Sequence, residues 1–551
     1  MPRRTSRPST PSAPSAAPPA DPALDSDHSP DRSPARDPDH SAGDVPSDLG
    51  PSSDSEFEFY APEEGDADDI ELDYVSTTLD ESADDNSPLA VFQGSQAAGN
   101  APGTSVWKWR KARNVIRRHG FQGTPGIKAQ ALNASSSVLD IFGEFFTPEL
   151  WQLMVCETNR YAAQNRRRTG KKMKAWVETT VEELKKYVGV RLLMAINMRP
   201  TLEMYWDTND LFGCPIVKRL FTRGRFFSLT SNLHFADNQN AVPGDRLAKL
   251  GRVIGILDDA CCRVYTPKQN VSVDESLWPY QGRHHARQYN PSKRARYGMK
   301  VYKLCASEGP AAGYTCSFKL YMGADRGELP ASTKVVLDLL HDAALLDKGY
   351  TVTLDNWYSS PTLYHMLQQR QTHAVGTVRM CRKFMPKDMV VKKRGDVDSR
   401  SSRTGMLALA WKDKKVVTML STCHDDTSTV TTNKRGVEKP IPLVVQDYNK
   451  WMGGVDLSDN LAQSYPTPRK THKWYIKVFF NLLDMSVVNS FAVHKELGGR
   501  LTHLAFKKEL CQALLGGSPT QPPPRMSRRT RSRSPLRAPA TPPPPSSPPC
   551  K

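Results

Sequence analysis

The feature that most constrains the fold is a change of hydrophobic period at residue 271. From 139 to 268 apolar residues recur three and four positions apart, as in "FFTPELWQLMV" (145–155). From 271 onward "VSVDESLW" (271–278), "YGMKVYKLCAS" (297–307) and "YTCSFKLYMG" (314–323) alternate with period two. The first spacing is typical of amphipathic helices and the second of half-buried strands. The pattern therefore predicts a helical region followed by a sheet.

The order of the following elements predicts the type of sheet. A helix is expected over 330–346, a strand over 350–358, a helix over 360–370 and a strand over 372–379. With the three strands before them, the order is β-β-β-α-β-α-β. This is the order of an α/β sheet of the ribonuclease-H-like type, in which the first and fourth strands are neighbours.

Acidic residues occupy the positions where such a sheet carries its chemistry. Asp274 and Asp355 are expected at the ends of the first and fourth strands, and Asp456 and Asp459 share one face of a helix that begins near Val455. Carboxylate oxygens are the ligands that Mg²⁺ prefers, and two such ions assist phosphoryl transfer. The sequence predicts that these carboxylates converge on paired Mg²⁺ ions, with Mn²⁺ as a substitute. Glu275 should point away, because successive strand side chains alternate faces.

Each acid also has a simpler interpretation that involves no metal. An acid after a strand is usually a turn residue or a helix cap, and "LDN" or "VDL" alone carries little weight. Three acids at the first-strand, fourth-strand and late-helix positions of one topology favour the metal site. The Asp426 and Asp447 carboxylates are interpreted as solvated surface groups.

The charge of the chain is unevenly distributed. Residues 1–43 contain five Arg and six Asp, and 44–85 contain sixteen acids with no Lys or Arg, so the net charge of +17 leaves +34 for 86–551. A strongly basic body favours a polyanionic partner, most simply nucleic acid, over a generic basic protein. The first 105 residues and the Pro/Arg-rich tail from 516 carry too little apolar surface to fold, so both are expected to be disordered. The tail's "RRTRSR" is either a nuclear-import signal or a loose phosphate contact.

Cysteine usage and hydropathy exclude several classes of protein. The ten Cys are scattered without a C-x-x-C pair, which argues for a reducing compartment and against a disulfide framework. The same scatter predicts no structural zinc. No run of about 18 apolar residues is evident, and the N-terminus lacks the apolar core of a secretory signal, so no membrane partner is expected.

Several long stretches resemble the piggyBac transposase family, over roughly residues 138–500. They are "FFTPELWQLMVCETNRYA", "LHFAD", "SVDES" followed by "RQYNPSK", "TLDNWYSS", "AVGTVR", "YNKWMGGVDLSDN" and "RKTHKWYIKVFFNLLD", in this order. The resemblance implies cut-and-paste DNA transposition at TTAA targets in the nucleus. It also implies double-stranded DNA partners and a homodimer, since two transposon ends are cleaved together.

The resemblance assigns roles to individual residues. It places the catalytic, metal-binding triad on Asp274, Asp355 and Asp456, with Asp459 at a further acidic position of the metal site. It implies DNA contacts for basic and aromatic residues that can meet phosphates or stack on unpaired bases; these are Arg379, Arg382, Lys383, Arg469, Lys470 and Trp474. For Trp474 a place in the hydrophobic core is the alternative.

The expected organisation combines both lines of argument. A ribonuclease-H-like catalytic core with an inserted β-rich segment is flanked by an α-helical DNA-binding and dimerisation domain. The segments are 1–105 (acidic, disordered), 106–268 (helical domain), 269–380 (core), 381–445 (insertion, with a hairpin over 406–423), 446–460 (core, third Asp), 461–515 (helical domain) and 516–551 (disordered).

One departure from the family leaves two functions open. PiggyBac transposases commonly end in a Cys/His-rich zinc module, and here the C-terminus has only Cys511, Cys550 and His503. The first function is a metal-dependent transposase, which the acid triad favours. The second is a domesticated DNA-binding protein without transposition, which the missing module favours.

Overall fold

The computed structural model describes residues 107–516, apart from 170–175, 210, 241, 243, 292–295, 324–327, 433–435, 437, 468–470 and 472. The predictions of disorder for 1–105 and for most of the C-terminal tail lie outside these residues. So do the predictions for Arg469 and Lys470. Of 165–169 the structure describes only the backbone.

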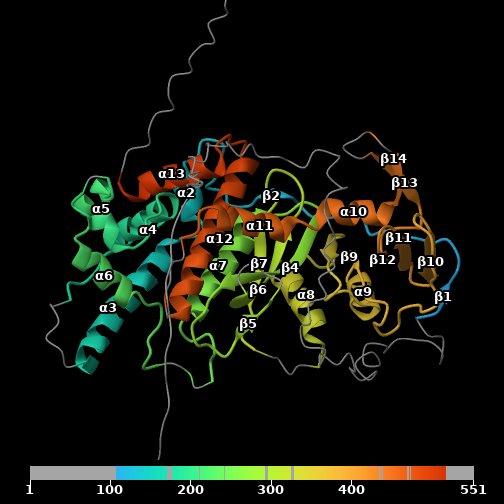
Figure 1. Cartoon of the computed structure of the whole chain (residues 1–551), viewed down its shortest axis with the longest axis horizontal. Helices are drawn as coiled ribbons and strands as arrows, with labels where there is room; N and C mark the ends of the chain where they lie inside the picture. Colours follow the sequence, from blue (N-terminus) through green and yellow to red (C-terminus); the bar gives the residue numbers. More distant parts are fainter. Residues whose placement is uncertain are drawn as a thin grey trace, which may run out of the picture. The chain divides into compact units, whose positions relative to one another are not determined.

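Helices form most of the described chain between residues 138 and 264, as the spacing predicts (Figure 1). Thr147 accepts a hydrogen bond from the Leu150 backbone N–H at 3.3 Å, so its hydroxyl caps the longest of them. The helices are α2 (Val138–Gly143), α3 (Pro148–Thr169), α4 (Val181–Ile196), α5 (Pro215–Leu220), α6 (Arg223–Asn232) and α7 (Gly251–Val264).

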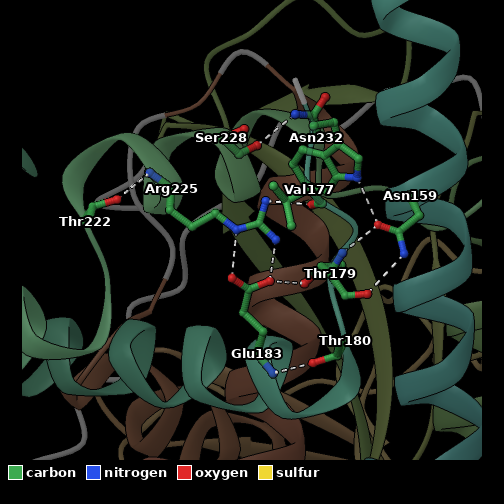
Figure 2. Close-up of polar contacts among 10 residues, drawn as sticks. Asn159, Val177, Thr179, Thr180, Glu183, Thr222, Arg225, Ser228 and Asn232 are labelled. Atoms are coloured by element: carbon green, nitrogen blue, oxygen red, sulfur yellow. Dashed lines mark hydrogen bonds and ion pairs between the residues drawn. The ribbon is translucent and has the colours of Figure 1, made fainter. Parts of the chain in front are cut away.

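An ion pair fixes α4 to α6 inside this helical region. Figure 2 shows the Arg225 guanidinium group reaching the Glu183 carboxylate, with N–O distances of 2.7 and 2.5 Å. The third Arg225 nitrogen donates to the Val177 carbonyl at 2.8 Å, and the Thr179 hydroxyl donates to Glu183 at 2.6 Å. Burial opposes ionisation of Glu183, but the hydrogen bonds from Arg225 and Thr179 outweigh it and lower the pKa of Glu183. The network therefore holds the segment before α4 in place.

A ten-stranded mixed sheet follows, and the predicted α/β class is confirmed. Its strands are joined in the order β1-β10-β11-β12-β9-β8-β4-β6-β5, and β7 also pairs with β6. The strands are β1 (Trp109–Arg110), β4 (Asn270–Pro279), β5 (Arg287–Tyr289), β6 (Tyr297–Ala306), β7 (Thr315–Leu320), β8 (Thr351–Leu354), β9 (His373–Thr377), β10 (Val397–Ser402), β11 (Leu407–Lys412) and β12 (Val416–Ser421). Two further pairs lie outside it: β2 (Gly126–Ile127) with β3 (Tyr265–Thr266), and β13 (Ser428–Thr432) with β14 (Glu438–Pro442).

The inserted segment continues the sheet. The expected hairpin over 406–423 is confirmed, since β11 pairs antiparallel with β12. Because β12 also pairs with β9, this hairpin extends the central strands. At the far edge β1 pairs with β10, so the start of the range predicted for the helical domain lies on the sheet.

The remaining described helices, two between strands of the sheet and four after it, pack on both regions. These are α8 (Ala331–Asp342), α9 (Pro361–Gln369), α10 (Leu443–Trp451), α11 (Gly454–Ser464), α12 (Trp474–Glu496) and α13 (His503–Leu514). Helix α11 packs on β4 and β6, α12 packs on α2 and α7, and α13 packs on α4. Helix α12 is long and apolar enough to span a membrane, but 89% of its most apolar window is buried inside the fold, as in a core helix.

Candidate active site

Asp274 and Asp355 are brought together by the parallel pairing of β4 with β8. The last pair in register is Val273 with Leu354, so each acid is the residue directly after that pair. The expectation that Asp274 ends its strand is wrong, because β4 continues to Pro279 in antiparallel pairing with β6. It is the parallel pairing with β8 that ends at Val273, and Asp274 and Asp355 directly follow its last pair.

The third acid comes from α11, which approaches the sheet closely at a glycine. A Cβ built on Gly454 would lie 2.6 Å from the Ser272 Oγ and 2.9 Å from the Ala306 carbonyl oxygen, so only glycine fits without displacement. Asp456 is in the first turn of this helix. The close contact therefore places the beginning of α11, with its acid, on strand β4.

Contacts on α11 identify the face of the sheet that carries the site. The Ser276 hydroxyl and the Lys303 ammonium group both donate to Asp459 Oδ1 at 2.7 Å. Asp274 lies on the same face, because it is directly opposite Lys303 in the β4–β6 register. Asp459 is thus held by two donors, and its predicted role as a metal ligand stays a prediction.

Glu275 lies on the opposite face, as strand alternation predicts, but it remains electrostatically close. Its carboxylate accepts a hydrogen bond from the Tyr358 hydroxyl at 3.2 Å and lies 3.8 Å from Lys300 Nζ. Tyr302, its partner across the strands, stacks on Trp357 with ring centroids 5.8 Å apart. Lys300 lies over both rings.

Burial first, and neighbouring negative charges second, raise the pKa values of Asp274 and Asp355. Burial raises the pKa of Asp274 well above its ordinary range, and the charges of Glu275, Asp355 and Asp456 raise it further. Burial and Glu275 raise the pKa of Asp355 to about 6, although the Trp357 backbone N–H donates to its carboxylate at 2.8 Å. Carboxylates with raised pKa values gathered at one place are typical of functional sites.

The chemistry of these donors fits a hard divalent cation. Oxygen ligands are what Mg²⁺ and Mn²⁺ accept, and a cation would relieve the repulsion that raises both pKa values. Within the described residues no group of three or more His, Cys, Asp or Glu side chains is close enough to form a ready-made metal site. The predicted convergence of the carboxylates is therefore supported by the effect of their charges on the pKa of Asp274, and not by a preformed set of metal ligands.

The basic residues after β9 lie beside the loop that follows Asp355. Arg379 Nε donates to Asn356 Oδ1 at 3.3 Å, and an Arg382 nitrogen donates to the Trp357 carbonyl at 2.5 Å. Lys383 is exposed, with its ammonium group 5.3 Å from the centre of the Phe384 ring. The structure thus brings Arg379 and Arg382 to the loop that follows Asp355, and contact of the three cations with DNA stays a prediction.

Trp474 begins α12 and lies against His284, with ring centroids 4.8 Å apart. The Trp474 side chain is half-buried and packs on the edge of the core. This position is compatible both with a core role and with a contact to DNA, the two interpretations that the sequence allowed. Lys473 donates to the Ser231 carbonyl at 2.6 Å, and Lys249 lies 5.0 Å from the centre of the Tyr475 ring. Burial lowers the pKa of both lysines. Sequence reasoning missed Lys249, Lys473 and His284, because these residues are distant in sequence and come together only in the folded chain.

Sequence reasoning also missed the Lys300 and Lys303 side chains, although both stand in the alternating stretch "YGMKVYKLCAS". A lysine at an inward strand position is the signal that could have identified Lys303. The Asp447 side chain is 39% exposed, in line with its interpretation as a solvated group, but its Oδ2 also lies 2.9 Å from His424 Nε2. Burial lowers the pKa of His424, but Cys423 and Asp447 outweigh burial and raise it to about 10.

Comparison with known proteins connects this arrangement to DNA transposition enzymes. A family model described as "Transposase IS4" matches residues 137–491. The chain is 27% identical over 407 residues to human PiggyBac transposable element-derived protein 3, covering 70% of this chain and 66% of that protein. It is 26% identical over 427 residues to human PiggyBac transposable element-derived protein 2, covering 74% and 70%. The chain thus spans slightly less than two thirds of the first of these relatives.

A solved structure has the same fold. The cryo-EM structure of a piggyBac transposase synaptic complex with hairpin DNA aligns with a TM-score of 0.62 and 23% identity, covering 71% of this chain and 83% of that one. At this identity the likeness concerns the fold alone. The family model, by contrast, covers more than half of the chain.

Proposed function

The chain belongs to the piggyBac transposases of the Transposase IS4 family, and on this basis we propose that it is a metal-dependent DNA strand-transfer enzyme. The proposed reaction is cut-and-paste cleavage of transposon ends and their joining to a TTAA target. The observation that carries the proposal is that Asp274 and Asp355 have raised pKa values, caused first by burial, and that the charges of Asp355 and Asp456 both act on Asp274. The strand order β7-β6-β4-β8-β9 supports a ribonuclease-H-like core around it.

In this proposal two Mg²⁺ ions, with Mn²⁺ as a substitute, are held by the three aspartates. Bound cations would supply a polarised water or hydroxyl nucleophile and charge for the leaving oxygen. The chain's own residues orient the carboxylates: the Trp357 N–H fixes Asp355, and the Gly454 contact fixes the helix that carries Asp456. Arg379 and Arg382, which brace the loop after Asp355, are suited to hold a phosphate of the target strand.

The proposed partner is double-stranded DNA, bound by a homodimer so that two ends are cleaved together. The charge of +34 on residues 86–551 supports a polyanionic ligand. Trp474, the half-buried indole beside His284, is suited to stack on an unpaired base. The proposed location of this activity is the nucleus.

The Asp355→Asn substitution tests the catalytic proposal. It keeps the hydrogen bond from Trp357 but removes a metal-binding charge, so nicking of a duplex carrying the genomic DNA that flanks the coding sequence should fall about 100-fold or more. Retention on that DNA should stay within about threefold, because phosphate-binding cations lie elsewhere. Chelating the divalent cations of the wild-type protein should have the same two effects.

A matched control is available at the other end of the same strand. Asp347, before β8, is exposed and bonded to Arg370 at 2.6 Å, so Asp347→Asn should nick like the wild type. If the wild type retains DNA and never nicks it, and Asp355→Asn behaves identically, catalysis is refuted.

A second function is binding of DNA without cleavage, as in a domesticated transposase. The observation in its favour is that no ready-made group of metal ligands is found among the described side chains. This function predicts DNA retention that is independent of Mg²⁺ and of Asp355. The same pair of assays therefore distinguishes the two functions.

A further inference from the structure

A buried lysine borders the acid cluster on the face that carries it. Only 1% of the Lys303 side chain is exposed, and its ammonium nitrogen lies 2.7 Å from Asp459 Oδ1. The Ser276 hydroxyl donates to the same oxygen at 2.7 Å, and Ser458 Oγ lies 3.5 Å from the ammonium group. Removing an ammonium ion from water is strongly unfavourable unless it is paired and hydrogen-bonded. Asp459 supplies that pairing here.

The position of this ion pair relates it directly to the proposed metal ligands. Lys303 on β6 is directly opposite Asp274 on β4, and such pairs have Cβ atoms about 5 Å apart. Asp459 follows Asp456 by three residues on α11, so both face the same side of that helix. The Lys303–Asp459 pair therefore joins the helix carrying Asp456 to β6, the strand that pairs with the one carrying Asp274.

We propose that Lys303 is a positioning residue which engages Asp459, excludes it from the set of metal ligands and supplies a fixed positive charge beside the acid cluster. This inference rests on the proposed function, since it concerns the same site. It gives Asp459 a different role from the one that the family resemblance implies. A divalent cation is then held by Asp274, Asp355 and Asp456 alone, and more weakly than it would be without the lysine.

The test measures Mn²⁺ affinity by calorimetry and thermal unfolding of the full chain with and without Mn²⁺. Lys303→Met removes the charge and leaves Asp459 without its cation. Without metal, the Tm of this variant should be lower than that of the wild type. Adding Mn²⁺ should raise the Tm of the variant by more than it raises the Tm of the wild type. Its affinity for Mn²⁺ should rise about tenfold or more, because a nearby like charge is gone and a carboxylate is released.

A double variant distinguishes a positioning role from metal ligation. Lys303→Met combined with Asp459→Asn removes one charge of each sign, so the local charge is unchanged. If Asp459 only holds Lys303, the double variant should bind Mn²⁺ within about threefold of the wild type. If it binds about tenfold more weakly, Asp459 is a ligand and the inference is wrong. This comparison remains decisive even if Lys303→Met alone fails to fold.

A matched control comes from a second buried ion pair. Lys507 and Asp484 are 2.9 Å apart with side chains 2% and 4% exposed, joining α13 to α12. Lys507→Met should lower Tm equally with and without Mn²⁺. If Lys303→Met behaves in the same way, its role is structural alone and the proposal is overturned.

Failure of the inference is separable from failure of the proposed function. The inference is also overturned if neither the wild type nor Lys303→Met binds Mn²⁺, and the nicking assay then decides the catalytic proposal independently. Conversely, the predicted pattern of Mn²⁺ affinities in a protein that never nicks DNA would support the inference and refute catalysis.

Discussion

At the scale of single residues, buried carboxylates carry both the proposed chemistry and a stability penalty. Asp258 on α7 is an example outside the candidate site. Burial raises its pKa to about 6, which the Phe318 backbone N–H, donating at 3.0 Å, only partly offsets. Lys319 lowers the pKa of Asp258 and Asp342 raises it. The folded state therefore binds a proton here more tightly than the unfolded chain.

The sign of the resulting pH effect follows from this difference. The contribution of Asp258 to stability is fully present below pH 4 and is lost as the pH rises through 6. Asp258→Asn keeps an acceptor for Phe318 but removes the charge. The variant should match the wild type near pH 4 and be more stable at pH 8 by up to about 3 kcal/mol. Urea denaturation at both pH values measures this, with exposed Asp259→Asn as the control that should show no such trend.

At the scale of elements, the contact between α11 and the sheet determines where the third acid lies. Strand β4 and helix α11 are far apart in sequence, and their approach depends on a missing side chain at Gly454. Gly453, the residue before it, has open space around its Cα and φ of −82°. Two adjacent glycines thus have different consequences when substituted.

Gly454→Ala should displace α11, because the new methyl group would meet the Ser272 hydroxyl, the Ser307 hydroxyl and the Ala306 carbonyl. We expect a loss of about 1–3 kcal/mol in the free energy of unfolding, together with reduced nicking because Asp456 moves with the helix. Gly453→Ala should change neither quantity appreciably. Equal effects of the two substitutions would show that α11 is not held by close packing at Gly454.

At the scale of the whole molecule, one sheet connects the acid cluster to the inserted segment. Strands β10, β11 and β12 continue from β9, and a second small hydrophobic cluster forms beneath them. This cluster includes Tyr448 of α10, whose pKa is raised by burial and by the charge of Asp355. The insertion therefore packs through α10 on the residues around the acids.

The basic charge of the whole molecule should govern its affinity for DNA. If about six phosphates are contacted, affinity should fall roughly 1,000-fold between 50 and 200 mM salt. Replacing Lys383, which is exposed in the segment after β9, with Ala should reduce the slope of log affinity against log salt by about one. Replacing Lys414, exposed on the turn between β11 and β12, should leave the slope unchanged. Binding measured across this salt range tests both, and an affinity insensitive to salt would argue against phosphate contact.

The sequence by itself determined the local elements and the acids placed along them. Burial of one face imposes a period of 3.6 or 2 on neighbouring residues, so the helices, the strands and the Thr147 cap were predictable from short windows. The positions of Asp274, Asp355 and Asp456 follow from that order of elements.

The tertiary structure alone decided which residues meet. The Lys303–Asp459 pair joins residues 156 positions apart, and it depends on the β4–β6 register and on the close approach of α11. The continuation of β4 past its acids and the joining of β12 to β9 likewise arise from strand pairing. A local pattern specifies which face of an element is buried but not its partner, because register and packing distance are set only when distant segments compete for the same surface.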